Sequence, residues 1–275
     1  MRALRSILAA TACVCLCAAA CGGGPVTPTA TPEATPTATP SPEPTAAPSL
    51  PIAILDPSMT AEQLLDDDIP AAELNLEERS RQSRDHAVIR DVQFTGADGQ
   101  PVPAFLIAPT NGRTRAGMLF LHWLGDDFSS RDEFVDEAVA LAAQGVESML
   151  ITQHFPWAER PLGVDHDRVA IGLQVRTIRR ALTLLAAEVG NVRMALVGHD
   201  YGAMYGSIVA GVDHRLRTAI FMTPTAHLST WNLIVKRRPD PDAYAAQMAI
   251  YDPAIICRMP RSPASYSNSR VRTNT

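Results

Sequence analysis

An aspartate stands between two glycines in the sequence Gly-His-Asp-Tyr-Gly at residues 198–202, and this spacing singles out Asp200 as a residue for chemistry. The motif follows an apolar run, 192–197, and precedes a stretch of small residues, so it lies at a predicted strand-to-helix turn. The glycines allow a cramped turn that lifts the middle residue clear of the sheet edge. A carboxylate there can attack an electrophilic carbon to form an ester, act as a base toward water, or be only a polar turn residue.

Hydrophobic periodicity predicts the elements that must position Asp200. Two strand-like runs flank the turn signal Gly-Ala-Asp-Gly at 96–99, which predicts an antiparallel hairpin. The expected strands are 87–94, 102–108, 117–122, 146–152, 192–197 and 216–222, and the expected helices are 134–142, 167–189 and 203–212. Strands that alternate with helices indicate a mostly parallel sheet covered on both faces. The polar segment 52–85 is expected to be a helical or irregular lead-in to this domain.

A hairpin that enters such a sheet and is followed by a strand-turn-helix motif resembles the α/β-hydrolase fold, over residues 85–253. The chain is most similar to the dienelactone hydrolase-like group, on the hairpin with Asp98 and Gly99, the Leu-His-Trp-Leu-Gly loop at 121–125 and the sequence 198–206. The resemblance implies that Asp200 takes the place of the nucleophile, where an esterase carries serine. The domain is expected to span residues 86–257 and to be followed by a disordered tail, 258–275.

The resemblance also implies where a developing oxyanion is stabilised. One backbone N–H is expected from Trp123, in the loop after strand 117–122, and the other from Tyr201, the residue after the nucleophile position. The neighbouring His122 is expected either to take part in catalysis or to end its strand and bond loop carbonyls. His199 is expected to point away from the pocket, because it stands beside the nucleophile in a tight turn.

The acid and the histidine that the resemblance implies after the last strands are not found where it places them. After Pro253 the chain continues with Ile-Ile-Cys at 255–257 and then with residues 258–275, which contain neither an acid nor a histidine. His227, after strand 216–222, remains the candidate base. The abrupt change of composition where a core strand is expected suggests a truncated or frame-shifted chain, which would expose a sheet edge and favour aggregation.

The N-terminus is typical of an exported protein. Residues 1–20 form a signal-peptide pattern, with two arginines, an apolar core and three alanines before Cys21. Ala-Ala-Ala-Cys resembles a bacterial lipobox, which implies a lipid on Cys21 and a membrane anchor; plain cleavage after Ala20 is the alternative, and incorporation of a labelled fatty acid separates the two. Residues 21–51, rich in proline and threonine, are expected to be an extended linker. We therefore expect a cell-surface or periplasmic protein.

Composition limits the partners and cofactors. The net charge of −5 argues against nucleic acid as a partner. Beyond the signal peptide only Cys21 and Cys257 remain, which is too few for a disulfide framework or a cysteine metal site. The loop 153–167 mixes histidines, aromatic residues and carboxylates without the spacing of a metal site. We expect no metal, no cofactor and a small-molecule substrate.

Three functions remain open. The first is a hydrolase that acts on an ester, a lactone or a similar small electrophile through Asp200. The second is a catalytically inactive surface lipoprotein or a truncated gene product. The third is epoxide hydrolase or haloalkane dehalogenase chemistry, which the aspartate resembles. Those enzymes carry a sizeable helical cap, whereas here only residues 223–253 are available, with Trp231 and Tyr244 on expected short helices.

Overall fold

The structure, a computed structural model, describes residues 55–123, 130–153, 163–235 and 239–256. All of the described residues belong to one compact unit, 46–275. The predicted signal peptide, the lipidation site Cys21, the linker and the tail 258–275 lie outside the described residues. None of the described helices has the length and apolar character of a membrane span.

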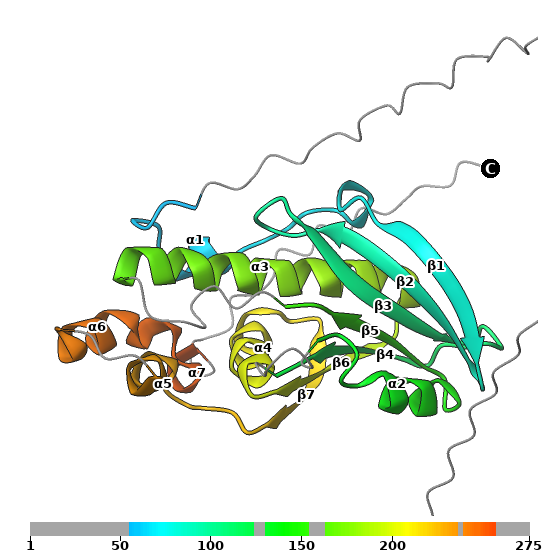
Figure 1. The fold of residues 1–275 in the computed structure, drawn as a ribbon. Helices are drawn as coiled ribbons and strands as arrows, with labels where there is room; N and C mark the ends of the chain where they lie inside the picture. The colour runs from blue at the N-terminus through cyan, green and yellow to red at the C-terminus, as the bar shows by residue number, and fades with distance from the viewer. Residues whose placement is uncertain (1–54, 124–129, 154–162, 236–238, 257–275) are drawn as a thin grey trace, which may run out of the picture. The chain divides into compact units, whose positions relative to one another are not determined.

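The described residues form one mixed sheet of seven strands, in the order β1-β2-β3-β5-β4-β6-β7 (Figure 1). The strands are β1 (Glu77–Arg84), β2 (Ala87–Thr95), β3 (Pro101–Pro109), β4 (Ala116–Leu121), β5 (Val146–Ile151), β6 (Arg193–His199) and β7 (Leu216–Met222). The first three strands pair antiparallel, β3 also pairs antiparallel with β5, and β5, β4, β6 and β7 are parallel. This arrangement confirms the predicted hairpin followed by a parallel sheet.

Helices cover both faces of the sheet. They are α1 (Ala61–Leu65), α2 (Val135–Ala142), α3 (Val164–Val189), α4 (Tyr201–Val212), α5 (Leu228–Val235), α6 (Pro241–Met248) and α7 (Pro253–Ile256), with 3-10 turns η1 (Ala71–Glu73) and η2 (Ala249–Tyr251). The apolar residues of α3 and α4 share one buried cluster with Leu196 of β6, and those of α2 share another with Val197. Successive β6 side chains therefore enter opposite core layers, as the continuous apolar run requires.

The segment before the hairpin corrects one expectation. Residues 77–84 were expected to be helical or irregular, but they form the edge strand β1, which pairs antiparallel with β2 and has a register shift between Glu78 and Ser80. All eight side chains of β1 are exposed, so the sequence lacks the apolar alternation that predicts a strand. Backbone pairing and surface ion pairs, such as Arg90 Nε to Glu78 Oε2 at 2.8 Å, hold it in place. Charged side chains of this kind protect an edge strand from pairing with other chains.

In the part of the chain that the structure describes, β7 is the opposite edge of the sheet. Within the described residues β7 pairs only with β6, and Ile220 and Met222 are 50% and 36% exposed. The residues expected to begin a further core strand form α7 instead, because Ile256 packs against α4, where a Cβ on Gly211 would lie 2.6 Å from Ile256 Cγ2.

Candidate active site

Asp200 is held in a strained backbone conformation at the carboxyl end of β6. It is the N-cap of α4, with φ 50° and ψ −115°, a region that residues with a side chain rarely occupy. Its N–H donates to the carbonyl oxygen of Met222 at 3.0 Å, and its own carbonyl accepts from Met204 N–H at 2.9 Å. The turn is therefore tied to the end of β7 on one side and to the first turn of α4 on the other.

The two glycines of the motif leave no room for a side chain. A Cβ on Gly198 would lie 2.5 Å from the carbonyl oxygen of Gly202. A Cβ on Gly202 would lie 2.4 Å from the carbonyl oxygen of Leu121 and 2.6 Å from that of His122. These contacts are to backbone atoms, which cannot move aside as a flexible side chain can. The glycines predict that β6, the turn and α4 approach each other closely, and the structure shows this close approach.

The two expected oxyanion donors differ in their surroundings. Tyr201 is the first residue of α4, so its N–H belongs to the helix N-terminus, where donors point outward and favour negative charge. Its buried ring meets Trp231 of α5 edge-on, with 5.0 Å between ring centroids. The Trp123 N–H instead donates to Glu133 Oε2 at 2.9 Å, because Glu133 lies just before α2 and reaches back to the end of β4. The sequence predicts that this N–H donates to an oxyanion of the substrate, but in the structure it donates to the Glu133 carboxylate.

His122 supports the structure around the end of β4. Its Nε2 accepts from the N–H of Gln153 at 2.9 Å, so its Nδ1 carries the proton and lies 2.8 Å from the carbonyl oxygen of Trp123. The Gln153 side chain returns a bond from Nε2 to the His122 carbonyl at 2.9 Å. Burial lowers the pKa of His122, which keeps the imidazole neutral in this network. Of the two roles expected for His122, the geometry favours the structural one.

The His199 side chain lies on the α2 side of the elbow, the turn formed by residues 198–202. It shares the α2 side of the sheet with Val197, because alternate strand residues face the same way. Its Nδ1 lies 2.6 Å from Glu133 Oε1, and the Trp123 ring stacks on it with 6.0 Å between centroids. His199, Glu133 and Trp123 thus form one side-chain cluster on that face.

An acid partner for His227 is the feature that the sequence analysis missed. His227 Nδ1 lies 3.2 Å from Asp252 Oδ2. The Asp252 carboxylate is buried and also accepts from the N–H of Ser229 at 2.9 Å and from its hydroxyl at 3.0 Å. The imidazole is 64% exposed, so a fixed carboxylate holds one side of the ring while Nε2 is left toward solvent. A general base in proteins is commonly built in this way.

The His227–Asp252 pair lies at the same sheet edge as Asp200. Met222, which accepts the Asp200 N–H, ends β7 five residues before His227, and α5 follows His227 directly. The contact between Trp231 of α5 and Tyr201 of α4 joins the two segments. In sheets of this kind ligands bind beyond the carboxyl ends of the strands, so both carboxylates and the imidazole are on the functional side.

No metal centre is visible in the part of the chain that the structure describes, where no three His, Cys, Asp or Glu side chains gather to hold an ion. Most of the loop considered for a metal, 154–162 with Trp157, lies outside the described residues. Tyr205, for which core packing was the simpler expectation, is fully buried in the α3–α4 layer.

The sequence matches no protein-family model and no curated protein. An acetyl xylan esterase from Paenibacillus sp. R4 superposes on the structure with a TM-score of 0.55 and 19% identity, over 71% of this chain and 72% of that one. The fold is that of the α/β-hydrolases.

Two further esterase structures superpose with lower TM-scores. Acetyl xylan esterase 1 from Thermoanaerobacterium sp. JW/SL YS485 gives a TM-score of 0.49 at 16% identity, over 71% of this chain and 72% of that one. A cold-adapted esterase from an Arctic intertidal metagenomic library gives 0.40 at 21% identity, over 53% of this chain. The match spans 64% of that esterase, which is less than two thirds of its length.

Proposed function

We propose that the chain is a hydrolase that acts on an ester, a lactone or a similar small electrophile, with Asp200 as the residue that meets the substrate. The strained conformation of Asp200, between two glycines that admit no side chain, carries this proposal. Strain of this kind costs on the order of 1–3 kcal/mol and is concentrated at functional sites. The name of the structural neighbour from Paenibacillus sp. R4, an acetyl xylan esterase, supports an ester as the substrate.

For an ester or a lactone, Asp200 acts as a base. Its carboxylate removes a proton from a water molecule, and the water oxygen adds to the carbonyl carbon. The carbonyl oxygen becomes an oxyanion, which the N–H of Tyr201 at the N-terminus of α4 stabilises. The bond from the carbonyl carbon to the alcohol oxygen then breaks, and Asp200 returns the proton to the leaving alkoxide. Attack by the carboxylate itself would form an anhydride, which makes the base role the simpler one for this substrate.

A second candidate is favoured by one observation, the carboxylate in place of a hydroxyl at the elbow. Asp200 would attack a saturated carbon of an epoxide or an alkyl halide, open the ring or release the halide, and form an alkyl ester. His227, held by Asp252, would then take a proton from the water that hydrolyses this ester. Between β7 and Asp252 only α5, α6 and η2 could cover the site. These elements are smaller than the helical cap of epoxide hydrolases and haloalkane dehalogenases.

Substitution of Asp200 tests the proposal. Rates with p-nitrophenyl acetate, a small lactone and styrene oxide should fall by about 100-fold or more in Asp200→Asn, whereas Asp242→Asn, on the exposed start of α6, should leave them unchanged. Equal rates in wild type and Asp200→Asn, or no turnover of any substrate by the wild type, would favour the inactive surface protein instead.

Isotope labelling separates the two chemical roles. In a single turnover in ¹⁸O-labelled water, a base mechanism places ¹⁸O in the product, whereas a nucleophile mechanism places it in the Asp200 carboxylate and leaves the product unlabelled. The variant His227→Gln gives an independent readout. It should accumulate a covalent adduct, seen as an increase of protein mass, only if Asp200 is the nucleophile.

A further inference from the structure

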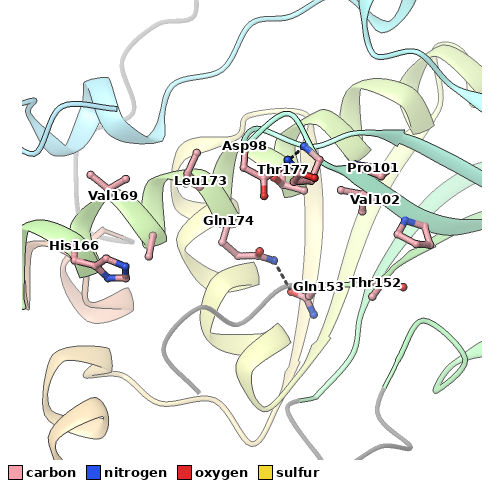
Figure 2. A pocket seen from close by; sticks show the side chains of 13 residues that line it. Asp98, Pro101, Val102, Thr152, Gln153, His166, Val169, Leu173, Gln174 and Thr177 are labelled. Carbon is pink, nitrogen blue, oxygen red and sulfur yellow. Dashed lines mark hydrogen bonds between the residues drawn. The ribbon is translucent and has the colours of Figure 1, made fainter. Parts of the chain in front are cut away.

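A cavity of about 500 Å³ lies between α3 and the beginning of β3 (Figure 2). One wall is a single face of α3, from His166 to Thr177, a length of about 16 Å along the helix. The opposite wall consists of the β2–β3 turn, the first residues of β3 and the residues that follow β5. The volume is that of a small-molecule site. No residue of the 198–202 motif lines this cavity.

Two buried amide side chains meet in this cavity. Gln153 and Gln174 are only 6% and 5% exposed. Figure 2 shows the two side chains pointing toward one another, and Gln174 Nε2 donates to Gln153 Oε1 over a long 3.4 Å. Gln153 is further fixed by its bond to the His122 carbonyl. Gln174 has no other hydrogen bond within the described residues, so its Oε1 and its second N–H face the cavity unpaired.

The unbonded atoms of Gln174 are open to the cavity. Polar groups inside native proteins are nearly always bonded to protein, water or ligand, so a ligand in the cavity would be expected to bond them. A ligand that both donates to Gln174 Oε1 and accepts from Gln174 Nε2 would satisfy both atoms at once. Two hydroxyls on neighbouring carbon atoms offer that pair of functions, because each hydroxyl can donate and accept.

The remaining lining defines the rest of the ligand. Val102 and Leu173 present apolar surface on the two walls, which suits the carbon atoms of a ring. Among the described lining residues there is no lysine or arginine, and the ionisable side chains are Asp98 and His166. An anionic ligand would find no fixed positive charge here, so a neutral ligand is favoured.

We infer that this cavity is a second binding site, for a neutral ligand that carries adjacent hydroxyl groups, with Gln174 as the residue that recognises it. The site shares the carboxyl edge of the sheet with Asp200 but opens beside β5, two strands from β6. Gln153 bonds the His122 carbonyl, which borders Gly202, so the cavity adjoins the 198–202 turn, but no residue of that motif lines it. Binding in the cavity therefore does not require turnover at Asp200.

Ligand-observed NMR with cis-cyclohexane-1,2-diol tests this inference on the full chain. Saturation transfer from the protein should be saturable at concentrations on the order of millimolar. Gln174→Met, which keeps the side-chain length, should weaken binding about tenfold, the effect of losing about one hydrogen bond. The matched control Gln247→Met, on the exposed face of α6, should bind like the wild type.

Three results would overturn the inference. They are no saturable binding of the diol by the wild type, unchanged binding by a folded Gln174 variant, and equally strong binding of cyclohexanecarboxylate. Gln174→Leu provides a second apolar variant should Gln174→Met fail to melt cooperatively. Because binding is measured without turnover, an inactive Asp200 would leave this result interpretable.

Discussion

The elbow around Asp200 and the His227–Asp252 pair lie at the same edge of the sheet, but different forces build them. The elbow consists of consecutive residues that pack closely on neighbouring backbone. Positions 198 and 202 therefore have room for glycine alone. The pair joins residues 25 positions apart through one side-chain contact of 3.2 Å, supported by Ser229. One is determined by steric exclusion and the other by polar side-chain contacts.

This difference predicts unequal tolerance to substitution. Packed backbone cannot relax without moving a strand or a helix. Even one added methyl group should therefore lower the free energy of unfolding by its full steric cost. In the pair the His227 ring is exposed and can exchange its protein partner for water, so only the loss of the buried Asp252 carboxylate leaves groups unsatisfied. The elbow should therefore respond more strongly than the pair to substitutions of similar size.

The largest effect is expected from Gly202→Ala. The new Cβ would meet the carbonyl oxygens of Leu121 and His122 at 2.4 and 2.6 Å, and it should lower the free energy of unfolding by about 3 kcal/mol or more. Urea denaturation measures this loss. Gly112→Ala is the control, because nothing lies within 4 Å of its Cβ and only its φ of +65° opposes a side chain, which should cost about 1 kcal/mol. Equal losses would contradict a steric origin of the elbow.

A smaller effect is expected from Asp252→Ala. This change removes the acceptor of the buried N–H and hydroxyl of Ser229, and it should cost about 1–3 kcal/mol in the same denaturation experiment. Asp252→Asn keeps an oxygen for Ser229 and should cost less. If Asp252→Ala destabilised the protein more than Gly202→Ala, the ranking of the two regions would be reversed.

Hydrophobic patterning made most of the fold predictable. Strands β4 to β7 and helices α2 to α4 carry apolar residues with the period of their element, and their ends fall within a few residues of the predicted ones. Strand β1 could not be found in this way, because its eight side chains are all exposed and it exists through pairing with β2. Residues 255–256 are apolar enough for a strand, but packing on α4 makes them helical.

The site was predictable only where it is local. Gly198 to Gly202 form a contiguous motif whose geometry follows from its glycines. The pairing of Asp252 with His227 depends on how α5, α6 and η2 fold back, which no short-range pattern records. The resemblance implies an acid beyond Pro253, whereas the acid that pairs with His227 stands one position before that proline. The bond between Glu133 and the Trp123 N–H could not be predicted either. It joins residues ten positions apart and depends on where the segment before α2 lies.

The smallest effect, and the opposite in sign, is expected from Asp200→Gly. Glycine accepts φ 50° and ψ −115° without strain, so the folded state should gain part of the roughly 1–3 kcal/mol that Asp200 stores. The greater freedom of glycine in the unfolded chain offsets about 0.5–1 kcal/mol, which leaves a net stabilisation of about 1 kcal/mol. Asp200→Asn keeps a side chain on the strained backbone and should show no such gain. A destabilised Asp200→Gly would mean that the side chain of Asp200 holds the elbow together, and the steric account of this region would then need its carboxylate as a second support.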